Sequence, residues 1–84
     1  MKITEIRLNK RNGDDNLLAI GSITLEEDFV VNGIKVLRAN DGNMFVGYPS
    51  RPNNKGGYSD VCFPLSKTLR EDIHTQVIAK YESL

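Results

Sequence analysis

The chain of 84 residues carries 11 basic and 11 acidic side chains, one cysteine (Cys62) and one histidine (His74). A lone cysteine excludes an internal disulfide and favours a reducing compartment, and one cysteine with one histidine cannot supply a tetrahedral zinc ligand set. The net charge of zero argues against a nucleic-acid-binding domain, because such domains are usually basic.

The length predicts a single domain over residues 1–84. A domain this short buries roughly 60% of the surface that its unfolded chain exposes, so a disulfide, a metal or a second subunit often stabilises it. Because the first two are excluded, we expect a homodimer. Met1–Lys10 lacks the apolar region of a signal peptide, and no apolar run approaches a membrane span, so we expect a cytoplasmic protein that does not enter the membrane.

The first strand is predicted over residues 3–9, where apolar and charged residues alternate. Residues 10–16 follow as a turn, in which Asn12-Gly13 is the strongest signal for a two-residue hairpin. The second strand is predicted over residues 17–25. Its odd positions form one apolar face (Leu17, Ala19, Gly21, Ile23 and Leu25), and Leu18 and Ile20 begin the other. A strand that is apolar on both faces is covered on both sides, and we expect the helix on one and a partner subunit on the other.

An acidic turn, residues 26–28, leads into a third strand over residues 29–38. Asn32-Gly33 inside it indicates either a hairpin or a bulge, and the short arm before it favours a bulge. The fourth and fifth strands are predicted over residues 44–48 and 58–63. A loop rich in proline and glycine, residues 49–57, separates them.

A single helix is predicted over residues 67–83, with Ser66 or Thr68 as its N-cap and Thr68 and Glu71 at capping-box spacing. Its apolar stripe consists of Leu69, Ile73, Val77, Tyr81 and Leu84. The predicted fold is therefore α+β, an antiparallel sheet of about five strands with one C-terminal helix packed on it.

Catalysis is not indicated by any pattern in the chain. His74 lies on a helix flank, and Cys62 lies in an apolar stretch where it behaves as a small hydrophobic residue. No nucleophile has a base and an orienting group at a recognisable spacing, and Gly56-Gly57 lacks the context of a phosphate-binding loop. We predict a protein that is not an enzyme and has no metal, no cofactor and no small-molecule substrate.

Nucleic-acid binding is favoured by the distribution of charge rather than by its sum. Residues 14–28 hold five acids and no base, whereas residues 29–70 hold six bases and two acids. The candidate phosphate contacts are two residues of the loop and three on one helix flank, namely Arg51, Lys55, Lys67, Arg70 and His74. The alternative is that these are solvated surface residues, with Arg70 paired to an acid such as Glu71. Tyr48 and Tyr58 flank the loop. The alternatives for them are stacking on bases and packing within the fold, and we interpret them as packing residues.

The order of several segments resembles the stage V sporulation protein G (SpoVG) family. The resemblance rests first on the central part of the chain, namely residues 34–36, Ala39-Asn40-Asp41-Gly42-Asn43, residues 44–50, Gly56-Gly57-Tyr58-Ser59-Asp60 and Pro64. It extends to residues 3–8, 23–25 and 29–31 on the N-terminal side and to Arg70 and Tyr81 in the helix. It covers essentially the whole chain.

The resemblance implies a homodimer that binds DNA and RNA and influences gene expression, sporulation or septation. It also implies septation proteins as partners. Arg51 falls at a basic loop position of the family and Arg70 at its helix arginine. Pro52, Ser59 and Phe63 stand where basic residues or histidine are common in the family, which predicts fewer phosphate contacts. The alternative from another class is a protein-interaction module that acts on the septation machinery without binding nucleic acid, by pairing at a sheet edge.

Overall fold

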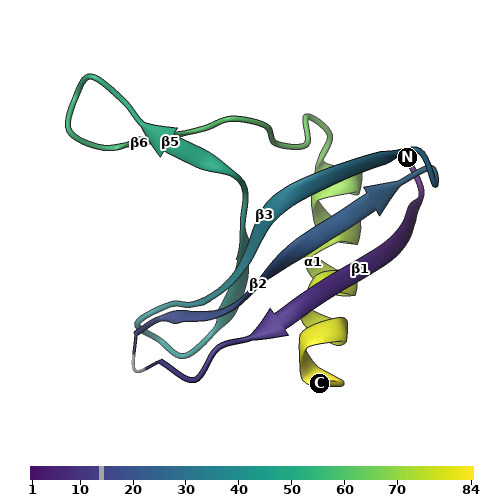
Figure 1. The fold of residues 1–84 in the computed structure, drawn as a ribbon, viewed down its shortest axis with the longest axis horizontal. Coiled ribbons are helices and arrows are strands. Elements are labelled where there is room, and N and C mark those ends of the chain that lie inside the picture. Colours follow the sequence, from purple (N-terminus) through teal and green to yellow (C-terminus); the bar gives the residue numbers. More distant parts are fainter. Residues whose placement is uncertain (14) are drawn as a thin grey trace.

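A computed structural model describes residues 1–13 and 15–84 of the chain; Asp14, which contributes to the predicted acidic region, lies outside the described residues. In chain order the elements are β1 (Ile3–Lys10), β2 (Leu17–Leu25), β3 (Phe29–Arg38), β4 (Met44–Gly47), β5 (Ser50–Pro52), β6 (Tyr58–Asp60) and α1 (Lys67–Glu82). The predicted α+β class with one C-terminal helix is confirmed. Figure 1 shows the helix lying across one face of the main sheet.

The main sheet contains β1 to β4 in chain order, and all neighbours are antiparallel. The order follows from the short connections, since consecutive strands joined by tight turns pair with each other. β2 and β3 span the predicted residues, and β1 and β4 differ from the prediction by one residue at one end. The turn predicted over residues 10–16 falls between the end of β1 at Lys10 and the start of β2 at Leu17.

A bulge interrupts the pairing of β2 with β3, as the sequence predicts. Gly21 lies opposite Ile34 and Ser22 opposite Asn32, which leaves Gly33 without a partner on β2. Gly33 has a φ of +86°, a conformation that side-chain-bearing residues rarely adopt. The bulge bends β3 just before the residues that pair with β4.

The acidic turn between β2 and β3 is held by the start of the chain. Glu26 and Glu27 both have positive φ, at 54° and 57°. The Glu26 amide donates to the Lys2 carbonyl at 2.8 Å, and the Glu27 amide donates to Thr4 Oγ1 at 3.0 Å. These bonds compensate for a backbone conformation that is unfavourable for residues other than glycine.

The core lies between the sheet and α1. It consists of seven buried apolar residues, Ala19, Ile23, Leu25, Ile34, Val36, Ile73 and Val77. Ser66 is the N-cap of the helix, and its Oγ accepts a hydrogen bond from the Leu69 amide at 3.0 Å. The predicted stripe holds from Leu69 to Tyr81, but Leu84 lies beyond the helix and is 49% exposed.

The faces of β2 differ in one respect from the prediction. Leu18 packs against the core, because the pairing register shifts between Leu17 and Ala19. Ile20 remains on the face opposite the helix and is 38% exposed. Within the chain, the helix covers only one face of the sheet, and a partner subunit on the other face stays a prediction.

The largest correction concerns residues 49–63. The segment predicted as a loop contains a strand, β5, which pairs with β6 to form a separate two-stranded sheet. The predicted strand over residues 58–63 ends at Asp60 and does not join the main sheet. We call residues 50–60 the hairpin arm. In Figure 1 the arm extends away from the main sheet at the upper left, and the chain then returns to the start of α1.

Candidate nucleic-acid interface

The hairpin arm positions two of the predicted phosphate-binding residues. In its pairing register, Ser50 lies opposite Asp60, Arg51 opposite Ser59 and Pro52 opposite Tyr58. The base of the arm is closed by a hydrogen bond of 2.7 Å from the Val61 amide to the Pro49 carbonyl. Proline is tolerated in this hairpin because a two-stranded sheet consists only of edge strands.

The tip of the arm is organised by the side chain of Asn53. Its Oδ1 accepts hydrogen bonds from the amides of Lys55 at 2.9 Å and Gly57 at 3.1 Å, and its Nδ2 donates to Ser59 Oγ at 3.0 Å. Asparagine often bonds the backbone of a following turn in this way. Gly56 supplies the positive φ, +81°, that the turn requires. The tip is therefore a defined turn that presents Lys55.

Arg51 and Lys55 are exposed, and neither takes part in an ion pair in the described part of the chain. Tyr58, opposite Pro52, is 72% exposed, so its interpretation as a packing residue is wrong. Tyr48, before the arm, packs against the core as predicted. The arm therefore presents two cations and one aromatic ring to solvent.

The helix carries the other three predicted residues on one exposed flank. Lys67 Nζ lies 3.8 Å from Glu71 Oε1, one helical turn later, and both side chains are largely exposed. An exposed pair of this kind contributes little and leaves the lysine available to other anions. Arg70 and His74 line a shallow depression together with Glu71 and Thr75. The structure thus brings the helix residues together, and it places Arg51 and Lys55 on a separate element.

Arg70 contacts the protein itself rather than Glu71. Its Nη2 donates to the Pro64 carbonyl at 3.2 Å, and its guanidinium carbon lies 5.7 Å from the centroid of the Tyr48 ring. A guanidinium at this distance from an aromatic ring is attracted by the ring's negative face. The alternative interpretation, that Arg70 pairs with Glu71, is wrong, since that carboxylate pairs with Lys67.

Tyr48 lies in a partly desolvated environment. Burial raises the pKa of its hydroxyl above 10.0, and the charge of Asp60 acts in the same direction, whereas the Arg70 guanidinium opposes both. Burial disfavours the charged phenolate because the protein solvates it less well than water does. Asp60 and Arg70 therefore both lie within electrostatic reach of Tyr48 at the base of the arm.

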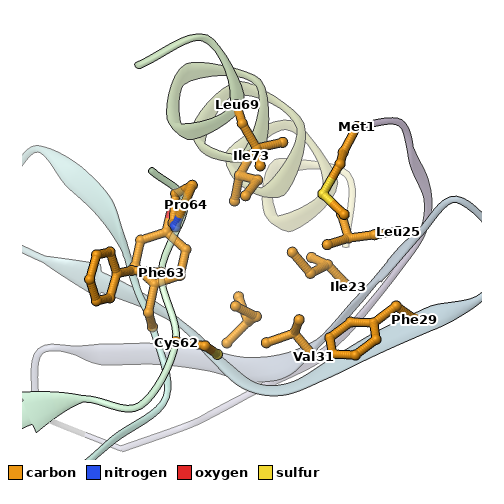
Figure 2. A pocket seen from close by; sticks show the side chains of 12 residues that line it. Met1, Ile23, Leu25, Phe29, Val31, Cys62, Phe63, Pro64, Leu69 and Ile73 are labelled. Carbon is orange, nitrogen blue, oxygen red and sulfur yellow. The ribbon is translucent and has the colours of Figure 1, made fainter. Parts of the chain in front are cut away.

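An apolar pocket of about 180 Å³ opens between the sheet, the first turns of α1 and the segment 62–64, a feature that the sequence analysis did not predict. Figure 2 shows Phe29 and Val31 facing it from β3, Leu69 and Ile73 from the helix, and Cys62 to Pro64 from the connecting segment. The strand predicted over residues 58–63 would have included Cys62 and Phe63. Because β6 ends at Asp60, Cys62 is exposed and Phe63 is 52% exposed.

No three histidine, cysteine, aspartate or glutamate side chains gather as a candidate metal site in residues 1–13 and 15–84. Over the same residues, no helix has both the length and the apolar character needed to cross a membrane.

Comparison with known proteins gives a consistent result. The family model SpoVG matches residues 1–83. A relative from Brevibacillus brevis is 40% identical over 98% of this chain and 85% of its own length, and one from Agathobacter rectalis is 37% identical over 99% and 94%. A relative from Staphylococcus saprophyticus is 38% identical over 98% and 80%. All three carry the name "Putative septation protein SpoVG".

Proposed function

Because the chain belongs to the SpoVG family, we propose that it is a homodimeric, non-enzymatic regulator that binds DNA and RNA through the hairpin arm. The relatives are named as septation proteins, and we propose that gene expression, sporulation or septation is the process it influences. The observation that carries this proposal is the arm itself, which holds Arg51, Lys55 and Tyr58 exposed on an element that projects from the sheet.

The chemistry of these side chains suits a nucleic-acid strand. Arg51 and Lys55 provide charge for two phosphates, and displacement of the counterions condensed on those phosphates favours binding. The ring of Tyr58 offers a face on which a base can stack, a contact that tolerates any base. Lys67 and His74 on the helix flank extend the proposed contact surface to a second element.

Order in the tip supports the proposal further. The Asn53 hydrogen bonds fix the turn that carries Lys55 before any ligand arrives. A loop that is already ordered loses less conformational entropy on binding than a mobile one. The net charge of the chain stays zero, so the field that matters is the local one at the arm.

We propose that the dimer joins two copies at the free edge of β3, and not through the second sheet face, the other place where a partner subunit was expected. β4 pairs only with residues 35–38, so Phe29–Asn32 have a neighbouring strand on one side only. Phe29 is 62% exposed and Val30 is 54% exposed, and the edge from 29 to 32 carries no charge. Uncharged edges of this kind readily pair with another strand. A two-fold axis at Val30 would pair the segment antiparallel with itself.

The same edge favours a second candidate function, a protein-interaction module that pairs with a strand of the septation machinery without binding nucleic acid. An extended segment of another protein can add to an open sheet edge through backbone hydrogen bonds, with side-chain pockets giving specificity. The apolar pocket beside Phe29 would accept a side chain of the added partner strand.

The test is the affinity for fluorescently labelled DNA and RNA fragments, measured by anisotropy from about 50 to about 200 mM salt. We expect Arg51→Glu with Lys55→Glu to weaken binding and to lower the salt slope by roughly two, at about 0.9 for each phosphate. Arg7→Glu with Lys80→Glu changes the charge equally away from the arm and is the matched control. A flat salt dependence, or an equal loss in the control, would contradict the proposal.

Light scattering of the free protein separates the two candidates. We expect a dimer that Val30→Lys converts to a monomer, because a charge at the edge opposes strand pairing. A monomeric wild type that retains a protein partner after nuclease treatment would favour the interaction module instead.

A further inference from the structure

We infer that Arg70 is a positioning residue, which fixes the base of the hairpin arm to helix α1 and so sets the direction in which the arm presents its cations. The contacts that Arg70 makes do not depend on the proposed function, but their consequence for nucleic-acid binding rests on it. Positioning the arm is a role different from the direct phosphate contact that the sequence predicts.

The arm is attached to the rest of the molecule only at its base. β5 and β6 make their contacts with each other and have no substantial packing against the main sheet or the helix. A two-stranded hairpin in water has little stability of its own. Its orientation therefore depends on the residues where the chain enters and leaves it, residues 48–49 and 61–64.

Arg70 contacts both of these segments. Tyr48 precedes the arm, and its ring centroid lies 5.7 Å from the guanidinium carbon. Pro64 follows the arm, and its carbonyl accepts a hydrogen bond of 3.2 Å from Nη2. Pro64 is itself buried, so the accepting carbonyl belongs to a well-anchored residue. One side chain from the helix thus joins the segments by which the chain enters and leaves the arm.

Two further contacts support this arrangement. The Val61 amide bonds to the Pro49 carbonyl at 2.7 Å, directly between the segments that Arg70 joins. Pro49 also packs close to Gly33, where an added Cβ would lie 3.5 Å from its Cγ. The negative charge of Asp60, the last residue of the arm, raises the pKa of Tyr48 and the positive charge of Arg70 lowers it, so both residues lie within electrostatic reach of Tyr48.

An arginine suits this pair of contacts better than a lysine does. A planar guanidinium can lie on an aromatic ring and donate hydrogen bonds in its own plane, whereas a lysine ammonium is a point charge without that fork. Lysine does, however, serve as a phosphate contact. Arg70→Lys therefore distinguishes a residue that positions the arm from one that binds phosphate by charge.

The experiment compares amide hydrogen exchange in the full chain, without nucleic acid, for the wild type, Arg70→Lys and Arg70→Ala. We expect exchange at the Val61 amide to rise about tenfold in both variants, since it reports local opening at the base of the arm. Amides of the core strands, such as Ile23 and Val36, should not change. Lys67→Ala, on the same flank, is the control and should leave Val61 at the wild-type rate.

Wild-type exchange at Val61 in Arg70→Lys would overturn the inference. So would a uniform rise that includes the core strands, because that would be global destabilisation. If Arg70→Ala does not fold, Arg70→Lys and Tyr48→Leu still test the contact.

Binding by the same variants separates this inference from the proposed function. Faster exchange at the arm in a protein that binds no nucleic acid would leave the positioning role intact and refute the function. Loss of binding in Arg70→Ala, with binding kept in Arg70→Lys and wild-type exchange at Val61 in both variants, would instead make Arg70 a direct phosphate contact.

Discussion

Gly21 lies near the centre of β2, where the backbone of β1 approaches it closely. A Cβ built on Gly21 would lie 1.7 Å from the Arg7 carbonyl oxygen and 2.9 Å from Leu8 Cα. Both are backbone atoms of β1, so no side-chain rotation relieves the overlap. Gly21→Ala therefore forces β1 and β2 apart, and we expect it to destabilise the fold.

The magnitude follows from the displacement needed. Ordinary van der Waals contact begins at 3.4 Å, so the strands must separate by about 1.7 Å at this point. Overpacking of this kind typically costs about 1–3 kcal/mol, and each hydrogen bond lost between β1 and β2 adds roughly 1 kcal/mol. We expect a total loss of about 3 kcal/mol. An 84-residue domain has a stability on the order of 4–13 kcal/mol, so this is a large fraction of it.

Urea unfolding followed by circular dichroism, at one fixed protein concentration, measures the effect. Gly42→Ala is the matched control. Gly42 has a φ of +90°, but nothing lies within 4 Å of its added Cβ, so that change carries only the backbone penalty of about 1–2 kcal/mol. If Gly21→Ala loses no more free energy of unfolding than Gly42→Ala, the steric reasoning is refuted.

Two further predictions concern the helix start and the base of the arm. Ser66→Ala should lower the free energy of unfolding by about 1 kcal/mol, because the Leu69 amide donates its hydrogen bond to Ser66 Oγ. Thr68→Ala should lower it by much less. Equal losses for the two variants in urea titrations would contradict the assignment of Ser66 as the N-cap. Because the pKa of Tyr48 is raised, the folded state holds its proton more tightly than the unfolded state. The stabilisation that comes from this tighter proton binding is full below about pH 10 and is lost as the pH rises through the raised pKa of Tyr48. Tyr48→Phe has no hydroxyl to titrate, so its melting temperature should decline less at alkaline pH than that of the wild type.

Local patterns predicted much of the fold. The alternation in residues 3–9, the apolar run 17–25 and the cap at Ser66 are each recognised from the types of residues close together in the sequence. The bulge at Gly33 was favoured over a hairpin because the arm before Asn32-Gly33 is short, which is also a local feature. In the structure, the order of the first four strands follows from their short connections.

The candidate site was predicted only in part. The exposed cations Arg51 and Lys55 were identified from the sequence, but the strand that carries Arg51 was not. Ser50–Pro52 contains a proline and no apolar alternation, and it pairs because Asn53 closes the turn beyond it. The partner of Arg70 was also missed, since the Pro64 carbonyl and the Tyr48 ring reach the helix only once the chain has folded back.

The sequence by itself determined the class of the fold, the family and the charged residues available for binding, because all of these are encoded in residue type and spacing. The tertiary structure decided how those residues are used. It directed the hairpin arm away from the sheet, left the edge of β3 unpaired, and placed Arg70 against Tyr48. These features arise from contacts between residues distant in the chain, which no local pattern encodes.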